Sequence, residues 1–285
     1  MALKLAWIDM DGTLLGKDQV EISPANLQAL EQLHSWGVEV VPCTGRVVDM
    51  LPPQLLALPW VRYVVSSHGA RVYDRHKNVS IYENVISPED SARILEKIEG
   101  EGIYAEIAAE HTIYIEEAAR KLLTCPPVPS HHVWYMIDRA LYTAVPCLSE
   151  YFREKGIGME KVNIYNMPEN MQQKIYDAVT QTGLIRHTRG AAAKDLEFQG
   201  TGLCKPKAME ALLRHLHLTY AETFAIGDSS TDADVIRESA VGVAMGNAPE
   251  DIQKLADYVT APNTEDGFAK AVEHFAAQFQ AGGKS

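Results

Sequence analysis

The stretch Ile8-Asp9-Met10-Asp11-Gly12-Thr13 follows directly on an apolar run, Leu3–Ile8, whose composition predicts a buried strand. Asp9 and Asp11 are two residues apart, and like charges that close raise each other's pKa unless a cation neutralises them. Gly12 comes next and allows the chain to turn sharply behind the two carboxylates. The stretch therefore predicts a strand end at which a pair of acidic side chains meets a positive charge.

Strand and helix patterns alternate on both sides of this stretch. Ser23 can cap a helix that Pro24 opens and Gly37 ends, and an amphipathic pattern predicts a second helix over 207–218. Short apolar runs predict the strands, which are 3–8, 38–41, 61–66, 223–226, 241–244 and 258–259. Strands that alternate with helices form a parallel sheet with right-handed crossovers. The expected fold class is therefore α/β, with a doubly wound, Rossmann-like parallel sheet.

The middle of the chain has a different character. It predicts helices over 88–100 and 168–182, and strands over 103–107, 113–115, 161–167 and 196–198. The polar loop motifs of the flanking regions do not occur there. The economical interpretation is a core of residues 1–83 and 201–285 that is interrupted by an inserted α/β cap of residues 84–200.

The composition argues against several classes of partner. The 285 residues carry a formal net charge of −12, from 26 basic and 38 acidic side chains. Nucleic acid and anionic membrane surfaces are bound through clustered lysine and arginine, so neither is expected as a partner. No apolar run approaches the roughly 18–20 residues of a membrane span. The four cysteines lack CxxC spacing and the N-terminal residues lack the pattern of a secretion signal, so we expect reduced thiols and a cytoplasmic protein.

Polar side chains follow three of the predicted strands, and a lysine precedes the helix over 207–218. These residues are Asp9, Asp11, Thr44, Gly45, Arg46, Asp228, Asp232 and Lys205. Ligands of an open parallel sheet bind at the carboxyl ends of the strands, where such residues meet. Magnesium prefers oxygen ligands and is usually held by one or two carboxylates together with substrate phosphate. Asp9 and Asp228 are therefore the candidate magnesium ligands, with the backbone carbonyl of Asp11 as a third oxygen.

The other residues at this edge suit a phosphate group. The Thr44 hydroxyl and the Gly45 N–H, at the start of an expected helix, form an anion site through unpaired donors and the helix dipole. Lys205 can offset the charge of a phosphoryl group during transfer, although in isolation it would read as a surface lysine. Arg46 is interpreted as an ion-pair partner rather than a phosphate ligand.

Four motifs in this order resemble one enzyme family. They are "DMDGT" (9–13), "TGR" (44–46), a lone lysine (205) and "GDSSTD" (227–232), and together they resemble the haloacid dehalogenase-like phosphohydrolases. Three later motifs resemble the Cof subgroup of that family: "VAMGNA" (243–248), "LADYVT" (255–260) and "NTEDGF" (263–268). The insertion between "SHGA" (67–70) and the lysine is similar to the α/β cap of that subgroup, which would select the substrate.

The resemblance implies a role for each matched position. Asp9 would be the nucleophile that attacks phosphorus and forms an aspartyl-phosphate, and Asp11 would protonate the leaving alkoxide and then activate water. A metal-bound carboxylate is a poor general acid, whereas its neighbour facing the leaving group can be kept protonated. Asp228 would bind magnesium, and Asp232 would orient the metal shell or Lys205. The implied phosphate contacts are the Met10 N–H, Thr44, Gly45, Lys205 and Thr231.

Three positions depart from the pattern of the subgroup. His68 stands where asparagine is usual, Thr231 replaces another asparagine, and Pro206 follows the lysine where glycine is common. None of these changes removes a charged catalytic group.

The resemblance thus implies a Mg²⁺-dependent phosphatase that acts on small phosphorylated metabolites such as sugar phosphates. Two other functions stay open at this point. A phosphomutase would use the same aspartate chemistry, and a sensor of phosphorylated metabolites would bind them without turnover. The sequence indicates neither the substrate nor the oligomeric state.

Overall fold

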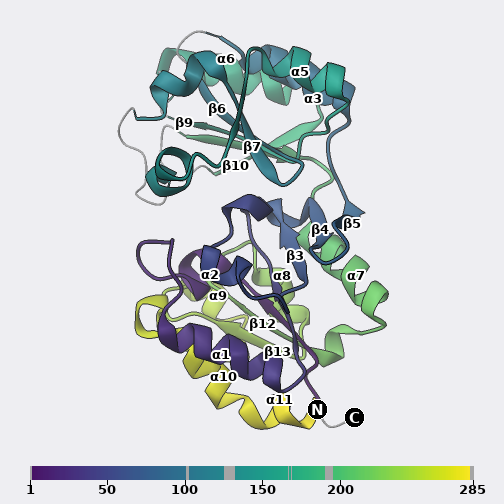
Figure 1. The fold of residues 1–285 in the computed structure, drawn as a ribbon, viewed down its shortest axis with the longest axis vertical. Helices are drawn as coiled ribbons and strands as arrows, with labels where there is room; N and C mark the ends of the chain where they lie inside the picture. The colour runs from purple at the N-terminus through teal and green to yellow at the C-terminus, as the bar shows by residue number, and fades with distance from the viewer. Residues whose placement is uncertain are drawn as a thin grey trace. The chain divides into compact units, whose positions relative to one another are not determined.

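The computed structural model describes residues 2–100, 103–124, 132–165, 167, 169–189 and 195–282. The chain forms two compact units, drawn as ribbons in Figure 1. The first unit comprises Met1–Arg46, Leu51–Glu83 and Cys204–Ser285, and the second comprises Val47–Met50 and Asn84–Leu203. The second unit therefore includes the short segment Val47–Met50, which lies outside the expected cap, and it extends three residues beyond the expected end at residue 200.

The first unit is built on a parallel sheet with the strand order β14-β13-β12-β1-β2. From one edge to the other these strands are Tyr258–Val259, Val241–Ala244, Thr223–Gly227, Leu5–Ile8 and Glu39–Pro42. Ile8 pairs with Ile226 on one side and with Pro42 on the other, so the carboxyl ends of β12, β1 and β2 are level. This register brings the residues that follow β1, β2 and β12 to one edge of the sheet.

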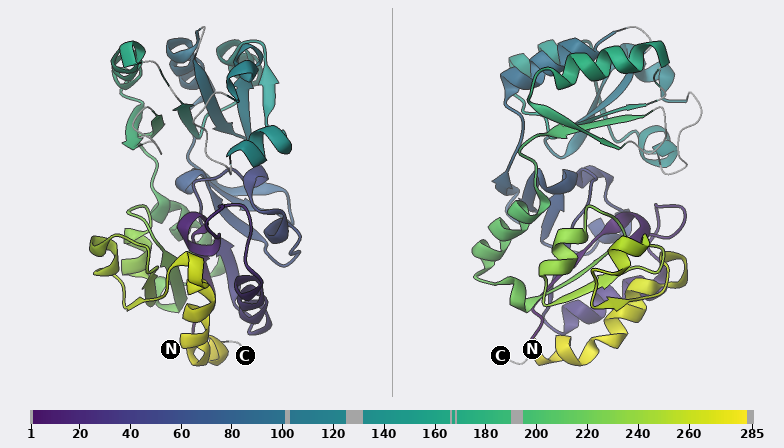
Figure 2. Two further views of the ribbon diagram at one scale, coloured as in Figure 1. Left: turned by 90° about the vertical axis from the view of Figure 1, so that its left-hand side faces the viewer. Right: turned by 180° about the vertical axis from the view of Figure 1, so that it is seen from behind.

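Helices cover both faces of this sheet, which can be followed in Figures 1 and 2. Helices α7 (Lys205–Leu216) and α8 (Ala233–Glu238) lie on one face, where Met209 and Val235 join a buried cluster with Trp7. Helix α1 (Pro24–Ser35) packs against α10 (Gly267–His274), which is followed by α11 (Ala276–Gly282). On that second face the rings of Phe275 and Phe279 lie 6.0 and 5.2 Å from the ring of Phe224. The predicted fold class, a doubly wound α/β sheet, is confirmed.

Helix α1 begins where the sequence predicts, and it also anchors the segment behind β1. The Ser23 hydroxyl caps the helix by accepting a hydrogen bond from the Asn26 N–H at 3.1 Å, and Pro24 occupies the first helical turn. The buried Asn26 side chain donates to the Leu14 carbonyl at 3.0 Å and accepts from the Ala269 N–H at 3.1 Å. These contacts tie the segment after the first strand to α1 and α10.

The expected strand over 61–66 is present, but it belongs to a second sheet. Strand β3 (Tyr63–Ser66) is joined to β2 through an isolated parallel bridge between Cys43 and Val65. It then forms an antiparallel sheet with β4 (Arg71–Asp74) and β5 (Val79–Glu83). The buried thiol of Cys43 packs within the apolar cluster of the first unit, as expected for a small core residue.

The second unit contains a mixed sheet with the order β10-β11-β9-β6-β7-β8. In that order the strands are Ile185–Arg189, Leu196–Gly200, Lys161–Tyr165, Tyr104–Ala109, Thr112–Glu116 and Thr143–Val145. The pairs are antiparallel except β7 with β8. Three helices contribute Leu95, Phe152 and Val179 to the apolar cluster on one face, and they are α3 (Pro88–Ile98), α5 (Leu148–Lys155) and α6 (Glu169–Thr180). On the other face, Val47 packs with Tyr104 and Ile113.

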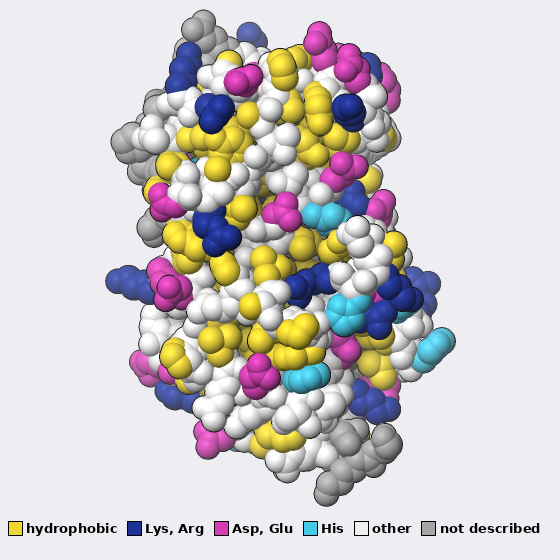
Figure 3. All heavy atoms as spheres, in the orientation of Figure 1, with side chains coloured by type: hydrophobic (Ala, Val, Ile, Leu, Met, Phe, Trp, Pro, Cys, Tyr) yellow, Lys and Arg dark blue, Asp and Glu magenta, His cyan; other side chains and the backbone are white. Residues whose placement is uncertain are grey.

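Free cysteines are found at positions 43, 147 and 204, whereas Cys125 lies outside the described residues. Among the helices that the structure describes, none has the length and apolar character needed to cross a membrane. Figure 3 shows basic and acidic side chains interspersed over one face of the molecule.

A buried polar group lies on the face of the second sheet that carries Val47. The Glu106 side chain is 3% exposed, the Tyr104 hydroxyl donates a hydrogen bond to it, and Nδ1 of His132 lies 3.3 Å from its Oε1. Burial raises the pKa of Glu106 to about 7, against the hydrogen bonds from its tyrosine neighbours. Burial also lowers the pKa of His132 to about 4, so the imidazole is neutral near pH 7.

The raised pKa makes the stability of this unit depend on pH. The folded state holds a proton on Glu106 that the unfolded chain has lost between pH 4.5 and about 7, so the contribution of Glu106 to the free energy of unfolding falls as the pH rises through this range. The lowered pKa of His132 has the opposite effect between about pH 4 and 6.5, because there only the unfolded chain binds the extra proton. Glu106→Gln removes the contribution of Glu106. Its free energy of unfolding relative to wild type should therefore increase by roughly 3 kcal/mol between pH 4.5 and 7 and then level off.

Urea unfolding at several pH values measures this difference. Glu150→Gln, at an exposed position of α5, is the control and should show no such trend. A Glu106→Gln difference that is constant across the pH range would show that the pKa of Glu106 is not raised.

Candidate active site

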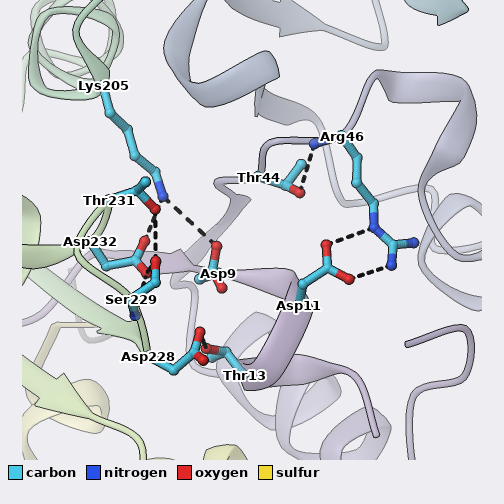
Figure 4. A network of polar contacts seen from close by, with 10 residues as sticks. All are labelled: Asp9, Asp11, Thr13, Thr44, Arg46, Lys205, Asp228, Ser229, Thr231 and Asp232. Atoms are coloured by element: carbon cyan, nitrogen blue, oxygen red, sulfur yellow. Dashed lines mark hydrogen bonds and ion pairs between the residues drawn. The ribbon is translucent and has the colours of Figure 1, made fainter. Parts of the chain in front are cut away.

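Two segments that are far apart in the sequence bring three acidic side chains together at the carboxyl edge of the first sheet. Asp9 follows β1, and Asp228 and Asp232 follow β12. One carboxylate oxygen from each of these three residues lies within 4.8 Å of the others. Figure 4 shows the three side chains together with Lys205, which begins α7 and whose ammonium group is turned toward Asp9 and Asp232. The predicted meeting of Asp9, Asp228, Asp232 and Lys205 is therefore what the structure shows.

The chain leaves β1 through a wide turn over Met10–Leu14. The Leu14 N–H donates to the Asp9 carbonyl at 3.3 Å and the Leu15 N–H donates to the Met10 carbonyl at 3.0 Å. Gly12 has a φ of +78°, and a Cβ at this position would lie 2.4 Å from Oδ2 of Asp228. Any side chain there would be strained and would push Asp228 away. The glycine is thus required by both the turn and the close approach of the carboxylate.

Two side chains hold Asp228 in place. The Thr13 hydroxyl donates to its Oδ1 at 3.4 Å, and Nδ2 of Asn247 donates to its Oδ2 at 3.2 Å. Asn247 also donates to the Gly12 carbonyl at 2.9 Å and therefore bridges the first turn and the β12 loop. The sequence reasoning gave Asn247 no role. Its place just after β13, at the same edge of the sheet, was the signal that could have found it.

The ammonium group of Lys205 lies between two carboxylates. Its Nζ is 2.6 Å from Oδ1 of Asp232 and 3.8 Å from Oδ1 of Asp9, and the lysine and Asp232 side chains are 6% and 1% exposed. Ser229 fixes the other Asp232 oxygen, through its N–H at 3.1 Å and its hydroxyl at 2.8 Å. Lys205 is therefore a buried cation with a fixed position, which excludes the alternative of a surface lysine.

Burial and repulsion between neighbouring carboxylates act on two of the acidic groups at this edge. Burial, followed by the Asp232 carboxylate, raises the pKa of Asp9 well above its ordinary value, although Lys205 opposes the shift. Burial and the Asp232 carboxylate also raise the pKa of Asp228, to about 6. Burial lowers the pKa of Lys205, but the Asp232 and Asp9 carboxylates raise it by more, so the lysine is charged. An all-oxygen set of carboxylates in this state fits a hard divalent cation such as Mg²⁺.

Thr44 and Gly45 lie at the same edge, but the helix expected after them is absent. The structure has a short 3₁₀ turn at Val48–Met50, which belongs to the second unit, and a four-residue helix, α2, at Pro53–Leu56. Consecutive prolines at positions 52 and 53 lack N–H donors and restrict the residues before them, so a helix cannot run through this segment. The prediction that a helix dipole supports the Gly45 N–H is therefore wrong.

The loop around Gly45 is shaped by His68 instead. A Cβ at position 45 would lie 2.4 Å from the imidazole ring of His68. His68 has a φ of +56°, a left-handed conformation that asparagine and histidine adopt more readily than most residues. The Thr44 hydroxyl accepts a hydrogen bond from the Arg46 N–H at 3.1 Å.

The other residues singled out in the sequence differ in exposure and in their contacts. The Met10 side chain is buried, so only its backbone can contribute to the site. The Thr231 side chain is exposed, and its hydroxyl lies 2.8 Å from the hydroxyl of Ser229. The Asp11 carboxylate forms an ion pair with Arg46, which agrees with the interpretation of Arg46 as an ion-pair partner. Pro206 lies in the first turn of α7, where a missing N–H costs little.

Comparison with known proteins decides the family. The sequence profile of the family described as haloacid dehalogenase-like hydrolase matches residues 6–272 of the 285. The chain belongs to the haloacid dehalogenase-like hydrolase family. The family predicted from the four motifs is thus confirmed, and the protein is an enzyme of the hydrolase class.

Relatives within this family match almost the whole chain. Phosphatase YwpJ of Bacillus subtilis is 29% identical over 293 residues, covering 95% of this chain and 99% of the relative. The 5-amino-6-(5-phospho-D-ribitylamino)uracil phosphatase YcsE of the same organism is 26% identical, with 96% of each chain covered. Among solved structures, a haloacid dehalogenase-like hydrolase from Bacteroides thetaiotaomicron superimposes with a TM-score of 0.80 at 25% identity, covering 96% of this chain and 99% of that one.

The buried pair in this hydrolase predicts a specific pattern of stability. Lys205→Met leaves the Asp232 carboxylate buried without its cation and should lower the free energy of unfolding by roughly 3–5 kcal/mol. Adding Asp232→Asn removes the orphaned charge, so the double variant should recover most of this loss. Urea unfolding of the two single variants, the double variant and wild type measures the coupling. A double variant whose destabilisation equals the sum of the two single losses would mean that the pair makes no net contribution.

Proposed function

We propose that this hydrolase is a Mg²⁺-dependent phosphatase that releases phosphate from small phosphorylated metabolites through an aspartyl-phosphate intermediate. The observation that carries the proposal is the convergence of Asp9, Asp228 and Asp232, with the buried cation of Lys205 beside Asp9 and Asp232. The names of the relatives support the same reaction class, because YwpJ and YcsE are both called phosphatases.

Two aspartates would divide the chemistry between them. Asp9 attacks phosphorus, a bond forms between its carboxylate oxygen and phosphorus, and the bond from phosphorus to the leaving oxygen breaks. Asp11 gives its proton to that leaving oxygen. In the second step Asp11 takes a proton from water, the water oxygen attacks phosphorus, and phosphate departs with the Asp9 carboxylate restored.

The remaining residues would hold the charges of the reaction. Lys205 compensates the negative charge that builds up on the phosphoryl oxygens, from a position already fixed by Asp232. The metal, when bound by Asp9, Asp228 and the Asp11 carbonyl, supplies a further positive charge at the phosphoryl group. Hydrogen bonds to the phosphoryl oxygens would come from the Met10 and Gly45 N–H groups and from the hydroxyls of Thr44 and Thr231. The second unit would select the substrate.

Two other functions, a sensor and a phosphomutase, differ from the proposed phosphatase in what they require and release. A sensor without turnover has no need of both a nucleophile and a proton donor, and this chain has Asp9 and Asp11 in place. A phosphomutase would return the phosphoryl group to a second hydroxyl of the substrate and would release no free phosphate.

The nucleophile is tested by phosphate release from an aryl phosphate and from a panel of sugar phosphates. Wild type should release phosphate with Mg²⁺ and lose this activity with a chelator. Asp9→Asn should have no activity under either condition, because an amide of the same shape cannot attack phosphorus. Asp234→Asn, an exposed aspartate paired with Arg237 on α8, is the matched control and should behave as wild type. Phosphate release from Asp9→Asn at the wild-type rate would exclude Asp9 as the nucleophile.

The proton donor is tested by changing the leaving group. Asp11→Asn should lower kcat/KM severely for a sugar phosphate, whose alkoxide must be protonated as it leaves, and much less for nitrophenyl phosphate. The loss on the sugar phosphate should be roughly 100-fold or more. Equal losses on the two substrates would argue that Asp11 is not the general acid.

A further inference from the structure

Arg46 and Asp11 form a two-point ion pair to which the proposed chemistry gives no task. Nε of Arg46 donates to Oδ2 of Asp11 at 2.8 Å, and Nη2 donates to Oδ1. Figure 4 shows the Asp11 carboxylate turned toward the guanidinium group of Arg46. A fork-shaped contact of this kind fixes the plane of a carboxylate as well as its position.

The arginine is the fixed partner of this pair. Nη2 of Arg46 also donates to the Gln19 carbonyl at 2.6 Å. Its backbone N–H donates to the Thr44 hydroxyl at 3.1 Å, and its carbonyl accepts from the Ser67 N–H at 2.9 Å. The Arg46 side chain is 9% exposed, whereas the Asp11 side chain is 38% exposed. A largely covered guanidinium, with a further hydrogen bond of its own to the Gln19 carbonyl, therefore holds a carboxylate that stays partly exposed.

We propose that Arg46 is a positioning residue, which fixes the plane of the Asp11 carboxyl group for proton transfer. This inference rests on the proposed function, in which Asp11 gives a proton to the leaving oxygen and later takes one from water. The guanidinium keeps its own protons throughout. Each carboxylate oxygen has more than one acceptor site, so contact with Arg46 leaves a site on both oxygens for the transferred proton.

Another arginine of the first unit shows the geometry of a purely structural pair. Arg62 holds Asp74 in the same two-point manner, with Nε at 3.0 Å from Oδ1 and Nη2 at 2.7 Å from Oδ2. Asp74 is 1% exposed and also accepts hydrogen bonds from the N–H groups of His76 and Lys77 at 3.0 and 3.2 Å. That carboxylate is closed in on all sides and fixes the turn after β4. It lies outside the catalytic residues, so it supplies a matched control for Arg46.

The test compares Arg46→Lys and Arg46→Ala with Arg62→Lys. Lysine keeps the charge but loses the fork, so each conservative variant removes the two-point geometry with the least risk to folding. The readout is kcat/KM, which covers the steps up to departure of the leaving group, for nitrophenyl phosphate and for the sugar phosphate that wild type hydrolyses fastest.

Both Arg46 variants should lose roughly 10- to 100-fold in kcat/KM on the sugar phosphate, as expected for a misplaced proton donor. Both should keep nearly full kcat/KM on nitrophenyl phosphate, whose leaving group needs no proton. Arg62→Lys should leave the two values unchanged. In an Asp11→Asn background, Arg46→Lys should cause no further loss on either substrate, because the group that it positions no longer transfers a proton.

Two results would overturn the positioning role of Arg46 and leave the proposed phosphatase function intact. One is an equal loss on both substrates, and the other is a full additional loss in the Asp11→Asn background, since each would indicate a structural role. A wild type that is inactive on every phosphomonoester overturns the proposed function, and this inference falls with it. The two failures are therefore distinguished by whether the wild type is active.

Discussion

Repulsion among the carboxylates of Asp9, Asp11, Asp228 and Asp232 is the constraint that the rest of the first unit has to meet. These groups meet because β1 and β12 are parallel neighbours in register, Ile8 opposite Ile226, so that segments more than 200 residues apart end at the same level. Each acidic group has its own compensation. Lys205 forms ion pairs with Asp232 and Asp9, and Arg46 forms an ion pair with Asp11. Asp228 instead accepts hydrogen bonds from Asn247 and Thr13.

The four carboxylates are not compensated equally. Burial, followed by repulsion from Asp232, raises the pKa of both Asp9 and Asp228, whereas Asp232 is held by the lysine and two donors from Ser229. A divalent cation bound by Asp9 and Asp228 would supply positive charge to these two carboxylates. The small residue Gly12 is part of the same arrangement, because its lack of a side chain lets Asp228 approach the first turn.

The residues that could be predicted from the sequence are those whose placement follows from the strand pattern. Asp9, Asp228 and Lys205 each lie at the end or start of an element that is clear in the hydrophobic pattern, so the sheet topology alone brings them together. The prediction of a helix directly after Thr44 was wrong, because the prolines at positions 52 and 53 outweigh the capping signal of a threonine and a glycine. The roles of Asn247 and of the Arg62 and Arg46 forks depend on side-chain contacts between distant segments, which no local pattern encodes.

The segment Val47–Met50 belongs to the second unit although the first unit surrounds it in the sequence. The chain consequently passes between the units at four peptide bonds, 46–47, 50–51, 83–84 and 203–204, rather than only at the two ends of the insertion. Val47 is 1% exposed and lies among apolar residues of the second sheet. A chimaera that exchanges residues 84–203 between relatives would therefore separate Val47 from the apolar neighbours it packs against. An exchange of the second unit of this chain should transfer Val47–Met50 together with the long segment.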